Sequence, residues 1–136
     1  MNVVVDTSIA AAWYLEESFS APAREWQQRI MSGNVHAMVP GLHYLEFANV
    51  LRTYVRRHEM QRELAEDIYA LHQDAPLDLV EPPRGNLLSV AFEYGATVYD
   101  AAYIALAQTY DCPLLTAERT TTPWVVKLGK LAVTVG

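Results

Sequence analysis

The stretch NVVVD, residues 2–6, decides the fold of this chain. Its three consecutive valines form a β-branched, continuously apolar run, which is typical of a strand buried on both faces of a parallel sheet. Asp6 places a carboxylate at the end of that strand, and Thr7 and Ser8 supply hydroxyls where a helix can begin. We therefore expect a strand over residues 2–6, followed by a helix that continues through Ile9 to Leu15.

Strands and helices alternate along the rest of the chain. Short apolar runs predict strands over residues 37–39, 77–80, 113–116 and 131–135. Helical spacing predicts a helix from Pro22 that ends at Gly33, and helices over residues 42–57, 64–71, 86–94 and 101–110. This alternation indicates an α/β domain with a largely parallel sheet. Because no repeat, low-complexity segment or linker interrupts it, we expect residues 1–136 to form a single domain.

Composition restricts the class of protein. Of the 136 residues 51% are hydrophobic and 19% are charged, which favours a folded globular protein over a disordered one. No apolar run approaches the ~20 residues that span a bilayer. Cys112 is the only cysteine, and MNVVVD lacks the positive charge of a signal peptide. We expect a cytoplasmic protein that does not bind membranes, whose net charge of -6 argues mildly against a nucleic-acid partner.

Four acidic residues fall where the predicted strands end or the predicted helices begin. Asp6 ends the first strand, and Glu46 lies early in the helix after the second. Asp100 opens a helix, and Glu118 follows the strand around Leu115. Since the carboxyl ends of parallel strands share one edge of a sheet, we expect these four carboxylates to meet there.

Crowded carboxylates repel one another and raise one another's pKa unless a cation compensates. Hard oxygen ligands suit Mg²⁺ or Mn²⁺, and such a site can activate water for attack on a phosphodiester. Each acid also has an ordinary structural interpretation. Asp100 is a good helix N-cap, Asp6 suits a turn, Glu46 can face solvent, and Glu118 can be a loop residue.

Four sequence blocks resemble the PIN-domain family, and above all its VapC-type toxins. The blocks are VVVDTSI (3–9), residues 40–52 with the core EFANVLR, VYDAAYIALA (98–107) and LLTAE (114–118). They cover essentially the whole chain in the family's order. The resemblance implies a three-layer α/β/α fold around a mainly parallel sheet and a Mg²⁺- or Mn²⁺-dependent endoribonuclease activity. It also implies a homodimer and a VapB-type antitoxin partner.

The resemblance assigns roles to individual residues. Asp6, Glu46 and Asp100 match the family's acidic positions, and Ser8 and Thr116 match its supporting hydroxyls. Glu118 departs from the family pattern, which has aspartate there. Its extra methylene puts the second metal, or the placement of the attacking water, in doubt.

The only dense basic run is a candidate RNA-binding surface. Arg52, Arg56 and Arg57 lie near the end of the helix over 42–57, where they can contact phosphates beside the acidic site. The alternative is a solvated helix end with cations at its C-terminal dipole.

Other reactive or aromatic residues have structural interpretations. The four histidines show no zinc-like spacing and are expected to be structural. Cys112 is expected to be an inert small hydrophobe, and Trp13, Tyr14, Trp26 and Tyr103 to serve core or dimer packing rather than base stacking.

Two other functions remain as alternatives. A phosphatase using Asp6 as nucleophile would usually have a second acid two residues later, where this chain has Ser8. A non-catalytic PIN-like module that binds RNA or protein finds its only support in Glu118.

Overall fold

The helices and strands follow the alternation that the sequence predicts. The computed structural model describes all 136 residues. Its strands are β1 (Asn2–Val5), β2 (His36–Val39), β3 (Leu77–Leu79), β4 (Leu114–Thr116) and β5 (Ala132–Thr134). Its α-helices are α1 (Thr7–Tyr14), α2 (Ser20–Met31), α3 (Leu42–Arg56), α4 (Arg62–Gln73), α5 (Leu87–Tyr94), α6 (Val98–Tyr110) and α7 (Pro123–Leu128), with 3₁₀ turns at Arg84–Asn86 and Gly129–Leu131.

The five strands form one sheet in the order β3-β2-β1-β4-β5, and every neighbouring pair is parallel. The valine-rich β1 is the central strand, with Val4 in register with Met38 of β2 and Leu114 of β4. A central strand is buried on both faces, which explains its continuous apolar sequence. The predicted parallel sheet is confirmed.

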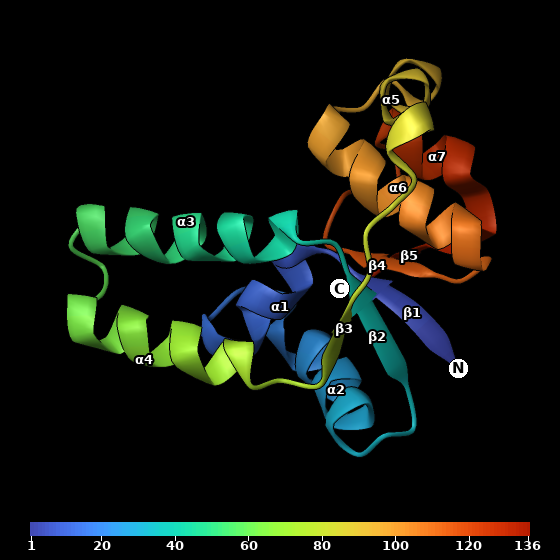
Figure 1. Cartoon of the computed structure of the whole chain (residues 1–136). Helices are drawn as coiled ribbons and strands as arrows, with labels where there is room; N and C mark the ends of the chain where they lie inside the picture. The colour runs from blue at the N-terminus through green and yellow to red at the C-terminus, as the bar shows by residue number, and fades with distance from the viewer.

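Alternate residues of the strands point to opposite layers of helices. Val3 and Val5 belong to a core shared with α1 to α4, whereas Val4 belongs to a second core shared with α5, α6 and α7. Figure 1 shows these two groups of helices on opposite sides of the sheet, with α3 and α4 extending as a hairpin away from it. The three-layer α/β/α architecture is confirmed.

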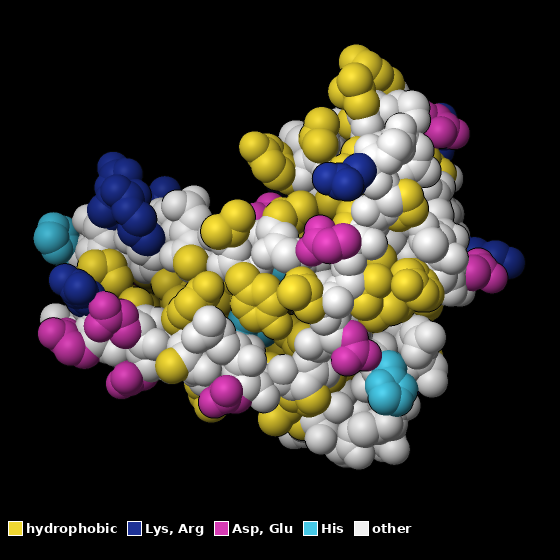
Figure 2. Space-filling model, in the orientation of Figure 1, with side chains coloured by type: hydrophobic (Ala, Val, Ile, Leu, Met, Phe, Trp, Pro, Cys, Tyr) yellow, Lys and Arg dark blue, Asp and Glu magenta, His cyan; other side chains and the backbone are white.

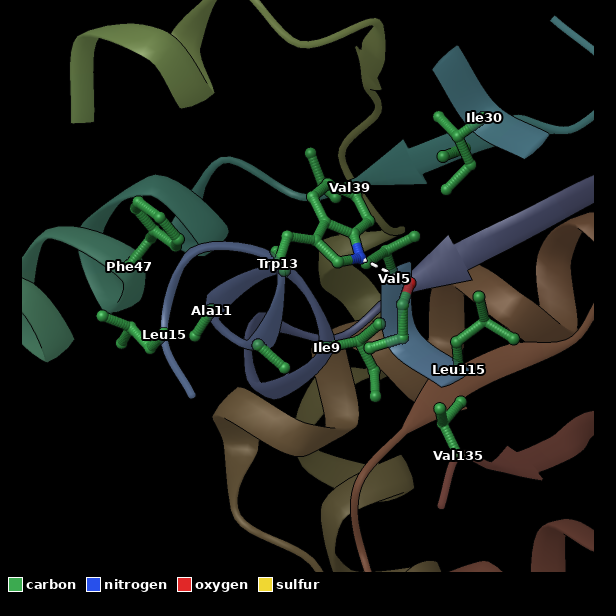
Figure 3. Close-up of a cluster of buried hydrophobic side chains, with 14 of the residues drawn as sticks. Val5, Ile9, Ala11, Trp13, Leu15, Ile30, Val39, Phe47, Leu115 and Val135 are labelled. Carbon is green, nitrogen blue, oxygen red and sulfur yellow. Dashed lines mark hydrogen bonds between the residues drawn. The ribbon is translucent and has the colours of Figure 1, made fainter. Parts of the chain in front are cut away.

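Helix α1, which follows Asp6, is mostly buried. Its Ile9 and Trp13 join Val5, Phe47 and Leu115 in the first core (Figure 3). The Trp13 indole Nε1–H donates a 3.0 Å hydrogen bond to the Ala23 carbonyl, which fastens α1 to α2. Burying such a large apolar side chain contributes ~1.5–3 kcal/mol, which stabilises the packing of α1 against the sheet and α2.

Two helix assignments differ from the sequence prediction. Helix α6 begins at Val98 rather than near Ala101, because the Thr97 hydroxyl caps it by accepting the Asp100 N–H at 3.0 Å. Helix α7 was not predicted, although Thr122 precedes Pro123 at its first turn as helix starts favour. None of the helices combines the length and the apolar character needed to cross a membrane.

Candidate active site

The candidate site lies at the point of the sheet where the order of strand addition reverses. The chain moves from β1 outward to β2 and β3 on one side, and then places β4 and β5 on the other. Between β1 and β4 the connections therefore diverge, and the carboxyl ends of the strands at such a point are where ligands bind in open α/β sheets. Asp6 follows β1 directly, and Thr116 ends β4 with Glu118 two residues later.

Asp6 is held by two hydroxyl groups. The Thr116 hydroxyl donates to Asp6 Oδ2 at 2.9 Å, and the Ser8 hydroxyl donates to the same oxygen at 3.2 Å. Ser8 is itself fixed by the Ala117 N–H, which donates to its Oγ at 3.2 Å. Oδ1 receives no hydrogen bond from the protein, so one carboxylate oxygen is anchored and the other is free.

The environment of Asp6 opposes its negative charge. Burial, followed by the charges of Asp100 and Glu46, raises the pKa of Asp6 to about 6, and the bonds from Thr116 and Ser8 lower it only in part. Burial also raises the pKa of Asp100, with added repulsion from Glu118 and Glu46 and partial relief from Thr97. The four predicted acids therefore act on one another electrostatically.

Glu46 is held in the same way as Asp6. It lies half-buried in the second turn of α3, and its Oε1 accepts hydrogen bonds from Thr7 at 2.9 Å and from Tyr103 at 2.8 Å. Oε2 receives none. Burial raises the pKa of the Tyr103 phenol well above its ordinary value, so the phenol remains a donor.

Sequence reasoning missed the roles of Thr7 and Tyr103. Thr7 was expected to help start α1, but its hydroxyl bonds Glu46, and no side chain caps that helix. Tyr103 is in the core as predicted, with only 3% of its surface exposed. The available signal was that a buried tyrosine hydroxyl needs a polar partner.

One of the ordinary interpretations of the acids is wrong. Asp100 is not the N-cap of α6, because Thr97 occupies that position and Asp100 stands in the first turn. Asp6 does lie in the turn between β1 and α1, where its Oδ2 accepts a hydrogen bond from Ser8, but its carboxylate makes no capping hydrogen bond. Neither carboxylate caps a helix.

Glu118 is the outermost of the four acids. Its side chain is exposed, and its Oε2 accepts a 3.2 Å hydrogen bond from Thr122. Its backbone N–H donates to Thr116 Oγ1 at 3.2 Å, which ties the loop to the hydroxyl that holds Asp6. Glu118 contributes to the raised pKa of Asp100 but is not among the causes for Asp6.

The donor set suits a hydrated divalent cation better than a closed cage. No three His, Cys, Asp or Glu side chains lie close enough together to hold an ion by themselves. Mg²⁺ keeps several waters and needs only one or two carboxylates. Asp6 Oδ1 and Glu46 Oε2 are uncommitted carboxylate oxygens in a region where negative charges repel, and a cation would offset that repulsion.

The basic cluster lies away from the acids. Arg52 and Arg56 are exposed in the C-terminal half of α3, and the exposed Arg57 is its C-cap. Arg56 follows Glu46 by ten residues, which corresponds to about 15 Å along a helix. Figure 2 shows dark blue side chains gathered at the outer end of the α3–α4 hairpin. Arg52 is the nearest of the three to Glu46 along the helix, and the contact of the three arginines with RNA stays a prediction.

The histidines divide into two exposed and two buried residues. His36 and His58 are exposed, whereas His43 and His72 are completely buried and face each other with their Nε2 atoms 3.0 Å apart. Their spacing in the sequence gave no sign of this contact. Burial lowers the pKa of His43 to about 3 and that of His72 to about 4. Cys112 is buried, as expected.

Comparisons with known proteins agree with the fold and with the sequence blocks. The family model of the PIN domain matches residues 3–120. Ribonuclease VapC3 of Pyrobaculum aerophilum is 31% identical over 123 residues, which cover 88% of this chain and 91% of that protein.

Solved structures with lower sequence identity share the fold. The crystal structure of PAE2754 from Pyrobaculum aerophilum matches with a TM-score of 0.73 and 23% identity, covering 99% of this chain and 90% of that one. Mycobacterium tuberculosis VapC20, described as a Sarcin-Ricin loop cleaving toxin, matches with a TM-score of 0.62 and 16% identity over 93% of this chain and 95% of its own. FitAcB from Neisseria gonorrhoeae gives 0.59 and 15%, over 97% and 96%. With a family model matched over most of its length and a VapC relative at this identity, the chain belongs to the PIN-domain family and resembles its VapC-type group.

Proposed function

We propose that this protein is a metal-dependent endoribonuclease and the cytoplasmic toxin of a VapBC-type toxin–antitoxin pair. The observation that carries the proposal is the crowding of Asp6, whose pKa is raised to about 6 by burial and by the charges of Asp100 and Glu46. Such a carboxylate gains from a neighbouring cation. The name of the relative Ribonuclease VapC3 supports RNA as the substrate.

In this proposal Asp6, Glu46, Asp100 and Glu118 hold Mg²⁺ or Mn²⁺ together with water. A bound divalent ion supplies a water of lowered pKa and positive charge to stabilise the oxygens of the phosphodiester during displacement. The protein supplies orientation. Ser8 and Thr116 fix Asp6 through Oδ2, while Thr7 and Tyr103 fix Glu46 through Oε1, which leaves one oxygen of each acid for the site.

Cleavage of RNA by purified protein tests the proposal. The protein, freed of any antitoxin, is incubated with structured RNAs and Mg²⁺ or Mn²⁺. Asp6→Asn and Asp100→Asn are each expected to abolish cleavage, whereas the matched control Asp67→Asn removes an exposed carboxylate of α4 and is expected to retain it. If RNA binds but no metal-dependent cut appears, the non-catalytic PIN-like module becomes the better account.

Two apolar surfaces support the proposed protein partners. A groove of about 460 Å³ between α3 and α4, lined by Leu51, Val55 and Tyr69 among others, offers an apolar site for a segment of the antitoxin.

Leu88 and Phe92 lie four residues apart on α5 and are 62% and 79% exposed, which suits a homodimer interface. Phe92→Glu is expected to yield monomers in sedimentation experiments, while dimers that persist would exclude this face.

A further inference from the structure

A continuous chain of hydrogen bonds runs behind Glu46 through the core. It begins at Tyr14, whose Oη lies 2.9 Å from Nδ1 of His72. The two histidines then meet through their Nε2 atoms at 3.0 Å. Nδ1 of His43 lies 3.3 Å from both Thr7 Oγ1 and Tyr103 Oη, and these two hydroxyls reach Oε1 of Glu46.

The two rings in this chain are shielded from solvent and from charge. His43 and His72 have no exposed surface, and His72 stacks on Phe47 with ring centroids 4.1 Å apart. Neither ring forms an ion pair or a hydrogen bond to a carboxylate. A buried imidazole without a counter-ion is neutral, so each ring carries a single N–H and must use its other nitrogen as an acceptor.

The oxygen cluster at Glu46 fixes the direction of donation. Oxygens of Thr7, Tyr103 and Glu46 lie 2.7, 2.8 and 2.9 Å from one another. The two hydroxyls carry the only hydrogens in this cluster, so at most two of the three contacts hold one. Turning either hydroxyl toward His43 would leave a single hydrogen among three closely spaced oxygens. Both hydroxyl hydrogens are therefore used within the cluster, and Nδ1 of His43 must be the donor toward it.

The remaining assignments follow from this one. If neutral His43 carries its hydrogen on Nδ1, its Nε2 accepts, and Nε2 of His72 must donate at 3.0 Å. Nδ1 of His72 then accepts from the Tyr14 hydroxyl. We infer that a directed relay of hydrogen bonds positions the Glu46 carboxylate, with donors passing inward in the order Tyr14, His72, His43 and finally Thr7 and Tyr103.

The relay gives five residues a positioning role. It anchors Oε1 of Glu46 on the inner side, so that Oε2 is the oxygen presented to the site. It also connects Tyr14 of α1 and His72 of α4 to the Glu46 carboxylate of α3, although neither residue was a candidate for the site. Its catalytic consequence rests on the proposed nuclease function, whereas the order of donors does not.

Nuclear magnetic resonance tests the order of donors independently of activity. Long-range ¹H–¹⁵N correlation spectra of the imidazoles are expected to show His43 with its hydrogen on Nδ1 and His72 with its hydrogen on Nε2. Tyr14→Phe removes the outermost donor and is expected to change the spectrum of His72. Two results would overturn the relay. One is a wild-type protein with the hydrogen of His43 on Nε2 and that of His72 on Nδ1, and the other is a His72 spectrum that Tyr14→Phe leaves unchanged.

Kinetics tests the positioning role. Tyr103→Phe is expected to lower kcat for RNA cleavage roughly 10–100-fold, as the loss of an outer-shell partner commonly does, with little change in KM. Tyr44→Phe is the matched control, because its ring packs against His43 at 5.4 Å between centroids but its hydroxyl makes no hydrogen bond to the relay. Equal kcat for both variants in an active enzyme would remove the positioning role, whereas an inactive wild-type protein would count against the nuclease proposal alone.

Discussion

At the scale of single residues, Asp6 and Glu46 follow one design. Each accepts two hydroxyl hydrogen bonds on one carboxylate oxygen and none on the other. The hydroxyls fix the rotamer without neutralising the charge. For Asp6 this arrangement is unfavourable in the absence of a cation, because its raised pKa means that the folded state disfavours the charged form.

Replacing Asp6 with asparagine should therefore stabilise the metal-free protein at neutral pH. The pKa of about 6 lies above the ordinary 3.8, so the charged carboxylate costs stability above pH 6, up to about 3 kcal/mol at ~1.4 kcal/mol per pKa unit. Denaturant unfolding of Asp6→Asn at pH 7.5 without divalent cations should show the gain, which should disappear near pH 4. A variant no more stable than the wild type at pH 7.5 would mean that Asp6 is not under electrostatic strain.

At the scale of elements, the sequence predicts the strands and most helices but not the contacts between distant helices. The apolar strands and the Pro and Gly boundaries of helices follow from local sequence, so all five strands and six of the α-helices were predictable. The sequence prediction starts α6 three residues too late, at Ala101, because the cap is Thr97 rather than Asp100. The meeting of His43 with His72 depends on how α4 docks against α3, and nothing in the local sequence encodes that contact.

The buried histidine pair should make stability depend on pH. The pKa values of about 3 for His43 and about 4 for His72 lie below the ordinary 6.5. The unfolded chain therefore binds more protons between these values, and stability is present above pH 6.5 and lost as pH falls toward 4. Asp6 shifts the other way and offsets part of this loss between pH 6 and 4.

His72→Phe isolates one member of the pair. Its free energy of unfolding should fall less steeply than that of the wild type between pH 6.5 and 4, by about 1.4 kcal/mol per pH unit for one proton. The groups facing the two rings are Tyr14, Tyr44, Tyr103 and Thr7. His36→Gln, at an exposed position, serves as the control. Parallel pH profiles for His72→Phe and wild type would show that His72 is protonated equally in both states.

At the scale of the whole molecule, the candidate acids and the basic cluster occupy different regions. The four candidate acids lie at the carboxyl edge of the sheet, while the exposed Arg52, Arg56 and Arg57 lie in the outer half of α3 and at its C-cap. This separation allows a protein of net charge -6 to contact an anionic RNA through a local basic surface. In the proposed complex, RNA bound at the arginines extends about 15 Å along α3 toward the acids.

Neutralising the three arginines tests this basic surface. The triple variant to glutamine should bind RNA more weakly and show a shallower dependence of affinity on salt, because each lost phosphate contact lowers the slope by about one unit. Arg24→Gln, which removes a cation paired with Glu16 elsewhere, is the control. An unchanged salt slope in the triple variant would assign the arginines to an ordinary solvated helix end.

The rate of RNA cleavage during Mg²⁺ titration tests the central claim most directly. Protein stripped of antitoxin and treated with a chelator is mixed in excess with labelled RNA, and Mg²⁺ is then added back in steps. Wild type and Asp67→Asn should rise from background to a plateau, while Asp6→Asn should remain about 10²-fold or more below them at every concentration. Cleavage that persists with chelator, or an Asp6→Asn curve that follows the wild type, would contradict the assignment of the clustered carboxylates as a metal-dependent nuclease site.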